Sequence, residues 1–372
     1  MPKITYLDYN ATAPVRPEVI DVMAEALAHP HNPSSAHFYG REGRKLVENA
    51  RETIAHAVSC WSNEVVFAAS GTEVNNMVLR GVGQRTLLIS AIEHSSIIKT
   101  VPDASRIGVD EQGVVKLDDL AQQLNALNGT PTLVSVMLAN NETGVIQPVG
   151  EVVKLCREYD NVLVHTDAAQ ALGKIPVDFQ LLGTDMMTLS AHKMGGPQGA
   201  AALVLRNDLP IAPLMTGGGQ ELGRRAGTEN VAAIAGFGKA VTLAAGDAAQ
   251  MKAVRGWLDA MEAELLSHCP DAMVFGRNAA RLPNTTAIHM PGVGSETQLM
   301  SFDLENIAIS AGSACSSGRI EASHVAKAMG FMEKASSSIR ISGGWNTTED
   351  DVRKMTASWK KLYDRVGAKA TV

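Results

Sequence analysis

The stretch "NVLVHTDAAQALGKIPVDFQLLGTDMMTLSAHK", residues 161–193, contains two short apolar runs that each end in polar residues. The first run leads into Asp167 and the second into Lys193, 26 positions later. That spacing is typical of one strand–helix–strand unit, so we expect the two runs on neighbouring strands of a parallel sheet. The carboxyl ends of parallel strands meet at one edge, and ligands bind there.

Runs of the same kind recur along the first half of the chain and predict further strands. Between several of them, apolar residues repeat every three or four positions, which predicts amphipathic helices. This alternation predicts an α/β domain with a largely parallel sheet, and the polar strand ends predict one shared site. The runs are 64–70, 86–94, 132–141, 161–170, 185–193 and 199–206; the helical faces are Val47, Ala50, Ile54 and Val58 in one helix, and Val152, Cys156 and Tyr159 in another.

The pattern changes near residue 240. A long helical segment follows, with a possible break around Gly246, and then three strand-like runs, "TTAIHMPG", "IAISAG" and "SSIRISGG". The last segment predicts a helix that Thr347 or Thr348 caps, with an apolar stripe on one face. We therefore expect a smaller α+β domain from about residue 251 onward. The stripe is Val352, Met355, Trp359, Leu362 and Val366.

The composition excludes several classes of protein. The chain has 372 residues, a formal net charge of −6 and no concentration of Lys and Arg, which argues against nucleic acid or a membrane surface as the main partner. The four cysteines are far apart and form no CxxC pair, so we expect neither a disulfide framework nor a structural metal site. The N-terminus is too polar for a signal peptide, and we expect a cytoplasmic protein.

Lys193 and Asp167 together suggest a chemistry. A lysine beyond a buried strand can lose its proton and act as a nucleophile toward an aldehyde. A carboxylate at the end of a buried strand needs a cationic partner, and pyridoxal phosphate enzymes place an acidic residue against the pyridinium nitrogen and a lysine on the aldehyde. The alternatives are a surface lysine in a turn and an aspartate that caps a helix.

Three further motifs have both a functional and a structural interpretation. "ASGTEVNN" (69–76) leads from a strand into a helix, so the amides of Gly71 and Thr72 could bind a phosphate, or the turn is an ordinary helix cap. "GGGQELGRRAGTEN" (217–230) offers its two arginines, Arg224 and Arg225, and Thr228 as anion contacts, or it is a solvated loop. His94 ends a strand, where it could stack on a cofactor and move protons, or fill a structural role.

Cys315 lies in "ISAGSACSSGRIEASH", residues 309–324, among small polar residues. A buried cysteine usually has apolar neighbours, so this thiol is predicted to lie on a mobile loop. The other three cysteines fit structural positions: Cys156 lies on the apolar face of a helix, and Cys60 and Cys269 lie near helix ends.

Taken together, these motifs resemble the cysteine desulfurases of the NifS/IscS type, within the class V aminotransferase group of fold-type I pyridoxal-phosphate enzymes. The resemblance implies a large domain over 15–250 with a mainly parallel central sheet. It also implies a small α+β domain, formed by 1–14 and 251–372, that carries the cysteine loop. The motifs are "YLDYNATAP", "NPSSAH", "SGTEVNN", "EHSSI", "ANNETGVIQP", "HTDAAQALGK", "SAHKMGGPQG", "GGGQELGRRAGTEN", "SAGSACSSG" and "SSIRISGG".

The resemblance also implies roles for individual residues. Lys193 would hold pyridoxal 5′-phosphate covalently, His94 would stack on its ring and act in proton transfer, and Cys315 would be the nucleophile. The other cofactor contacts would be Asp167 at the pyridinium nitrogen, Gln170 at the ring oxygen, Gly71, Thr72, Ser190 and His192 at the phosphate, Thr228 from the second protomer of a homodimer, and Asn141. The substrate pocket would include Asn141, Arg340, Asn10 and Asn32, with Arg225 as a further anion contact.

The implied reaction takes sulfur from L-cysteine, leaves L-alanine and forms a persulfide on Cys315. The loop places no basic residue directly beside Cys315, so we expect His94 or the substrate to favour the thiolate. The persulfide would pass to an acceptor protein, such as an iron–sulfur scaffold. Two alternatives stay open: a selenocysteine lyase or another pyridoxal-phosphate lyase or transferase on the same scaffold, and a cofactor-free sulfur-carrier platform.

Overall fold

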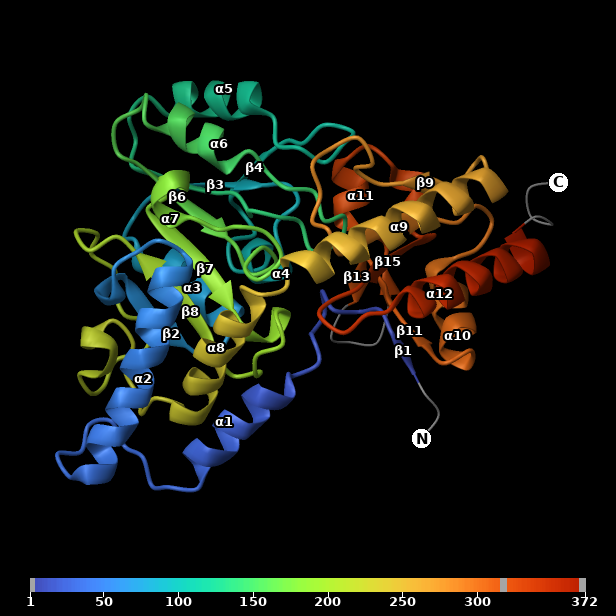
Figure 1. Cartoon of the computed structure of the whole chain (residues 1–372). Coiled ribbons are helices and arrows are strands. Elements are labelled where there is room, and N and C mark those ends of the chain that lie inside the picture. Colours follow the sequence, from blue (N-terminus) through green and yellow to red (C-terminus); the bar gives the residue numbers. More distant parts are fainter. Residues whose placement is uncertain (1–3, 315–319, 368–372) are drawn as a thin grey trace.

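The computed structural model describes residues 4–314 and 320–367. A seven-stranded sheet forms the centre of the larger part of the molecule (Figure 1). Five of its strands, β3 to β7, run parallel, whereas β8 is antiparallel to both β7 and β2. In spatial order the strands are β2 (Val65–Ala68), β8 (Ala201–Leu205), β7 (Met186–Ser190), β6 (Val162–Asp167), β5 (Thr132–Ser135), β3 (Thr86–Ser90) and β4 (Ser105–Ile107).

Apolar side chains on both faces of this sheet are buried because helices cover both faces. In β2, Val65 and Phe67 belong to one core cluster, and Val66 and Ala68 belong to another on the opposite face. This is the period of two that a strand requires. Core residues of α2 (Phe38–Ala57), α5 (Leu117–Leu127), α6 (Val149–Cys156) and α8 (Val231–Ala244) join the first cluster; those of α3 (Gly71–Gly81) and α4 (Ser95–Ile98) join the second.

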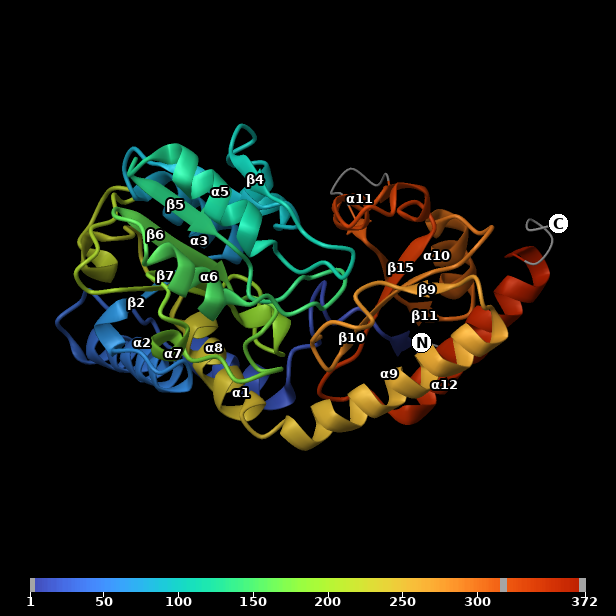
Figure 2. The same ribbon diagram turned by 90° about the horizontal axis from the view of Figure 1, so that it is seen from above.

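The smaller part of the molecule contains a four-stranded antiparallel sheet. Trp359 is fully buried in its core cluster, together with Leu7 from the start of the chain. In Figure 2, α9 and α12 run side by side along this part. Its sheet strands are β12 (Ser310–Ala311), β15 (Ser338–Ser342), β10 (Thr285–His289) and β9 (Met273–Val274); its helices are α9 (Ala248–His268), α10 (Ser295–Leu304), α11 (His324–Ala328) and α12 (Glu349–Leu362).

Short elements complete the fold. The N-terminal strand β1 (Thr5–Tyr6) pairs in parallel with β11 (Ile307–Ala308), which ties the start of the chain to the smaller part. The hairpin strands β13 (Ser313–Ala314) and β14 (Ile320–Glu321) pair on either side of residues 315–319. The remaining helices are α1 (Pro17–Leu27), α7 (Phe179–Leu182), the 3-10 helices Ser62–Glu64, Ala191–Lys193, Gln220–Gly223 and Met332–Lys334, and the π-helix Tyr363–Gly367.

The structure confirms the alternation predicted from the sequence. All six predicted strands of the large sheet are present with shorter bounds, the helical segment after residue 231 is broken between Ala244 and Ala248, and Thr348 caps α12. One helical face was too long: Val152 and Cys156 are buried in α6, but the helix ends at Cys156, and Tyr159 packs against the same core cluster from a turn beyond it. Asn161, directly before β6, takes a left-handed φ of 61°. The strands β1, β4, β9, β13 and β14 were not predicted. The domain bounds, 15–250 for the large domain and 1–14 with 251–372 for the small domain, stay a prediction.

Within residues 4–314 and 320–367, no single helix is long and apolar enough to cross a membrane. The pair α8 and α9 meets the criterion of length and composition only when the two are joined, and they are bent by 71° at the break.

Candidate active site

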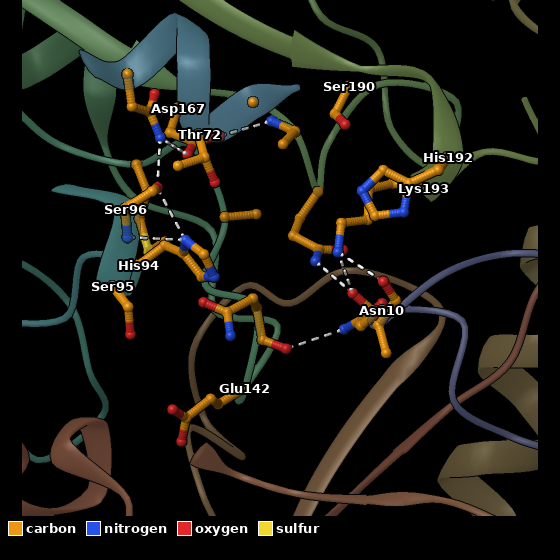
Figure 3. A pocket seen from close by; sticks show the side chains of 18 of the residues that line it. Asn10, Thr72, His94, Ser95, Ser96, Glu142, Asp167, Ser190, His192 and Lys193 are labelled. Atoms are coloured by element: carbon orange, nitrogen blue, oxygen red, sulfur yellow. Dashed lines mark hydrogen bonds between the residues drawn. The ribbon is translucent and has the colours of Figure 1, made fainter. Parts of the chain in front are cut away.

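A cavity of about 390 Å³ opens beyond the carboxyl ends of β6 and β7 (Figure 3). Asp167 is the last residue of β6 and Ser190 the last of β7, so the sheet itself brings two predicted site residues to this edge. The structure brings most of the predicted residues together here. Those that line the cavity are Asn10, Gly71, Thr72, His94, Asn141, Asp167, Gln170, Ser190, His192, Lys193 and Arg340.

Lys193 enters the cavity from the 3-10 helix that follows β7. Its Nζ donates to the carbonyl oxygens of Asn10 at 2.8 Å and Ala11 at 2.9 Å. Burial lowers the pKa of Lys193 to about 8, the Arg340 charge acts in the same direction, and the Asp167 carboxylate opposes both. A lysine with this pKa supplies far more neutral amine near pH 7 than an exposed one.

Asp167 is held by two donors. Asn75 Nδ2 lies 2.9 Å from its Oδ2, and the backbone N–H of Ala169 lies 2.9 Å from its Oδ1. Asn75 Nδ2 also donates to Ser96 Oγ at 2.8 Å, and Ser96 Oγ lies 2.8 Å from His94 Nδ1. One asparagine therefore connects the carboxylate and the imidazole of the site.

His94 is oriented by the residues that follow it. The backbone N–H of Ser96 donates to His94 Nδ1 at 3.1 Å, so a neutral ring carries its proton on Nε2. The ring is exposed within the open cavity, yet desolvation by the cavity walls lowers the pKa of His94, and only the Asp167 charge raises it. Burial also lowers the pKa of His192 to about 4, and the charges of Lys193 and Lys174 add to this effect.

The N-terminus of α3 borders the same cavity. Ser70 caps the helix by accepting from the N–H of Glu73 at 3.1 Å. The N–H groups of Gly71 and Thr72 have no partner within the described residues, and the helix dipole gives this end a partial positive charge. Arg225 is held against α3, because its Nε lies 2.9 Å from Glu73 Oε1. The arrangement can bind an anion such as a phosphate group.

Arg340, which lies on β15, borders the cavity on the side of the smaller sheet. Its guanidinium donates to Asp8 Oδ1 at 2.7 Å and to the carbonyl oxygen of Asn141 at 3.1 Å. Arg340 Nε and Asn141 Oδ1 are buried and have no hydrogen-bond partner in the part of the chain that the structure describes. Asn10 joins these segments, since its Nδ2 donates to Thr285 Oγ1 at 2.9 Å and to the Asn141 carbonyl at 3.2 Å.

Four of the predicted residues that the structure describes do not line this cavity: Asn32, Arg224, Arg225 and Thr228. Cys315 lies outside the described residues. Thr228 and Asn32 are exposed and do not line the cavity of their own chain. Asn32 Oδ1 instead accepts from the N–H of Ser34 at 3.1 Å.

Sequence reasoning missed several residues that line or support the cavity. Asn75 lies in the quoted motif "SGTEVNN", four positions after Gly71, so the helical period could have identified it. Ser96 follows His94 in "EHSSI", at the spacing of a side-chain cap. Glu142 and His324 also line the cavity, and no local pattern marked them. Their nearest approach is 3.7 Å, between His324 Nδ1 and Glu142 Oε1.

Comparison with known proteins identifies the family. The family described as Aminotransferase class-V matches residues 5–355. A cysteine desulfurase IscS of Dictyoglomus turgidum is 40% identical over 382 aligned positions, covering 98% of this chain and 96% of the relative. Cysteine desulfurase 2 of Trichormus variabilis is 37% identical, covering 98% and 94%. The solved structure of a NifS-like protein from Rickettsia africae ESF-5 is 38% identical, with a TM-score of 0.91 over 97% of this chain and 100% of that chain. The chain therefore belongs to the class V aminotransferase family, and within it to the cysteine desulfurases of the NifS/IscS type.

Proposed function

We propose that this chain uses pyridoxal 5′-phosphate to take sulfur from L-cysteine, releases L-alanine and carries the sulfur as a persulfide on Cys315. The observation that carries the proposal is the cavity that Lys193 and Asp167 share beyond two adjacent parallel strands. The amine and the carboxylate are the two groups that a pyridoxal-phosphate enzyme places at the aldehyde and at the ring nitrogen.

The donor set of the cavity fits this cofactor. Lys193 has a lowered pKa, so its amine would be available to the aldehyde, and Asp167, held by two donors, would pair with the cationic ring nitrogen. The open N–H groups of Gly71 and Thr72, with Ser190 and His192 nearby, match a phosphate. When bound, the cofactor supplies an electron sink that stabilises negative charge at the substrate Cα.

Two side chains of this cavity are suited to moving protons. Lys193 Nζ, held by two carbonyl oxygens, would take the proton from the substrate Cα once the amine is free. His94 would present its Nε2–H to the cavity, because Ser96 occupies Nδ1. Desolvation by the cavity walls lowers the pKa of His94, which favours the neutral ring.

Arg340 would hold the substrate carboxylate. Asp8 and the Asn141 carbonyl fix the guanidinium at one edge, and Nε remains without a partner within the described residues. A planar guanidinium pairs with a carboxylate through two parallel hydrogen bonds, which would fix the orientation of the amino acid. Asn141 and Asn10 would complete this side of the pocket.

Cys315 would receive the sulfur. Its thiolate would form a bond to the substrate sulfur while the substrate carbon–sulfur bond breaks. Burial raises the pKa of Cys60 and of Cys156 to about 12, so these thiols stay protonated and unreactive near pH 7. The persulfide would then pass to an acceptor protein, and a second copy of the chain would contribute Thr228 to the phosphate site.

The experiment measures alanine and sulfide released from L-cysteine in the presence of a thiol reductant. We expect both products from the unmodified protein and none above background from Lys193→Ala. Cys315→Ala should lose the release of alanine and sulfide, whereas the control variant Cys60→Ala should keep both. Equal alanine release by Cys315→Ala and the unmodified protein would contradict the proposed role of Cys315.

A further inference from the structure

Lys174 is a second lysine beside the site, and the proposed reaction gives it no role. It ends the motif "HTDAAQALGK", four residues after Gln170, in the turns that follow β6. Gly173 precedes it with a left-handed φ of 80°, and a Cβ at Gly173 would lie 2.9 Å from the Cβ of Met194. A side chain at position 173 would be strained by the left-handed φ and crowded by Met194 and Ala244, so glycine allows the tight turn that precedes Lys174.

The Lys174 amine lies between two side-chain amides. Its Nζ is 2.7 Å from Gln170 Oε1 and 2.9 Å from Asn10 Oδ1. The backbone carbonyl of Asn10 links this pair to Lys193. It accepts from Gln170 Nε2 at 2.9 Å and from Lys193 Nζ at 2.8 Å. Asn10 thus connects the Lys174 amine directly to the Lys193 amine, which is proposed to bind the cofactor.

Lys174 and the Asn10 carbonyl act together on the orientation of the Gln170 amide, because the amine donates to its oxygen and the carbonyl accepts from its nitrogen. The oxygen and nitrogen ends of an amide have nearly the same shape, so packing alone does not distinguish them. An amine has N–H donors in both of its protonation states, and two amide oxygens satisfy two of them. With its oxygen on Lys174, Gln170 must direct its NH₂ group toward Asn10 and the cavity.

We propose that Lys174 is a positioning residue that fixes the orientation of the Gln170 amide, so that Gln170 offers an N–H donor to the ring oxygen of the cofactor. The inference rests on the proposed function, because it takes the cofactor to lie against Lys193. One hydrogen of Gln170 Nε2 is used by the Asn10 carbonyl, and the second is available to the cofactor. A reversed amide would present an oxygen to that oxygen instead.

The electrostatic surroundings agree with this role. Burial lowers the pKa of Lys174 well below its ordinary value, and the charges of Lys193 and Arg340 lower it further. Asp247 lines the same small cavity but is paired with Arg16. A charged Lys174 therefore has no carboxylate of its own among the described residues, which fits a donor to amide oxygens rather than an ion-pair partner.

The test uses the protein loaded with pyridoxal phosphate and compares Lys174→Met with the exposed control Lys154→Met. The readout is the pH dependence of the absorption bands of the bound cofactor, which reports the ionisation of its ring oxygen and needs no turnover. Loss of a hydrogen bond to a charged oxygen should change the ratio of the ionised to the neutral form about tenfold. We expect this change in Lys174→Met and none in Lys154→Met.

A second variant tests the route through Gln170. Gln170→Leu should produce the same spectral change, and the double variant should show no larger change than either single variant. A Lys174→Met protein whose spectrum and pH profile match those of the unmodified protein would overturn the inference. So would a double variant in which the two changes add.

A measurement on the unmodified protein covers the case in which the variants do not fold. Neutron diffraction locates deuterium atoms and distinguishes the two ends of an amide. Gln170 Oε1 facing Lys174 is the expected result, and Nε2 facing Lys174 would refute the inference. An unmodified protein that binds no pyridoxal phosphate would instead refute the proposed function.

Discussion

Asn75 Nδ2 lies 2.9 Å from Asp167 Oδ2, although the two residues are 92 positions apart in the chain. The same Nδ2 reaches Ser96 Oγ, and Asn75 Oδ1 accepts from Thr188 Oγ1 at 2.7 Å. All polar atoms of this buried amide are therefore used. Asn75 holds the carboxylate in place from the helix whose N-terminus borders the proposed phosphate site.

Replacement of Asn75 tests this contact. We expect Asn75→Ala to weaken binding of pyridoxal phosphate about tenfold or more, because a hydrogen bond to a charged group contributes about 1.5–3 kcal/mol. The dissociation constant can be measured by fluorescence titration of the stripped protein. Asn49→Ala, at an exposed position of α2, is the control and should bind the cofactor as the unmodified protein does.

The pKa of Lys193 predicts how capture of the cofactor depends on pH. Only the neutral amine attacks an aldehyde, and the neutral fraction rises with pH until it saturates above the pKa of about 8. The rate of cofactor capture should level off there, whereas the rate for an exposed lysine would continue to rise up to about pH 10. Stopped-flow absorbance would measure the rate. A rate that still climbs steeply well above pH 8 would disagree with this prediction.

Glu93 should make stability depend on pH. Burial raises the pKa of this fully buried carboxyl to about 8, and its Oε2 has no partner in the described part of the chain. Between the ordinary glutamate pKa of about 4.3 and 8, the folded state binds more protons than the unfolded state, so stability falls as pH rises through this range. In urea unfolding, the free energy of unfolding should fall less over this pH range for Glu93→Gln than for the unmodified protein. An identical slope in the two proteins would count against a protonated Glu93.

Arg340 is expected to set the affinity for the substrate. Arg340→Lys keeps the charge but loses the planar fork, so we expect kcat/KM for L-cysteine to fall about tenfold or more, mainly through KM. Steady-state release of alanine measures both constants. The control is Arg353→Lys, an exposed pair with Glu349 on α12, which should leave KM unchanged. A lower kcat with an unchanged KM would show that Arg340 does not bind the substrate.

Glu221 should be important for stability. Its carboxylate accepts from Arg51 at 2.8 Å through both oxygens and from the N–H of Phe67 at 2.8 Å, and the pair is largely buried. Because removing one partner leaves a buried charge, Glu221→Gln should cost about 3–5 kcal/mol in urea unfolding. Asp208→Asn breaks an exposed pair with Arg206 and should cost about 1 kcal/mol or less. Equal costs would mean that the burial of the pair does not matter.

The sequence predicted the parts of the site that local patterns encode. Asp167 ends the strand β6 and Lys193 lies three residues after the end of β7, so two apolar runs with polar endings were enough to locate them. Asn10 and Arg340 could not be derived in that way, because their contacts join opposite ends of the chain: the N–H of Asn10 donates to Ser342 Oγ at 3.0 Å. Only the resemblance to a family indicated their roles before the structure.

The pairing of Asn75 with Asp167 shows a second limit. Its helical spacing was visible, but the partner depends on how α3 packs across the sheet, which no pattern of periodicity encodes. The same holds for Lys174, whose amine reaches Asn10 across 164 positions of sequence. Long-range polar contacts of this kind are specified by the three-dimensional packing of segments, so they become visible only with the fold.

The position of the first strand has a consequence for synthesis of the protein. The N–H of Leu7 donates to the Ala308 carbonyl, and the Leu7 carbonyl accepts from the N–H of Ser342, both at 2.8 Å. Residues directly after this strand supply the carbonyl oxygens that hold Lys193. A growing chain on the ribosome therefore makes its N-terminal residues first but can place them only after residue 342 has emerged. Until then the nascent protein would lack a finished place for its cofactor.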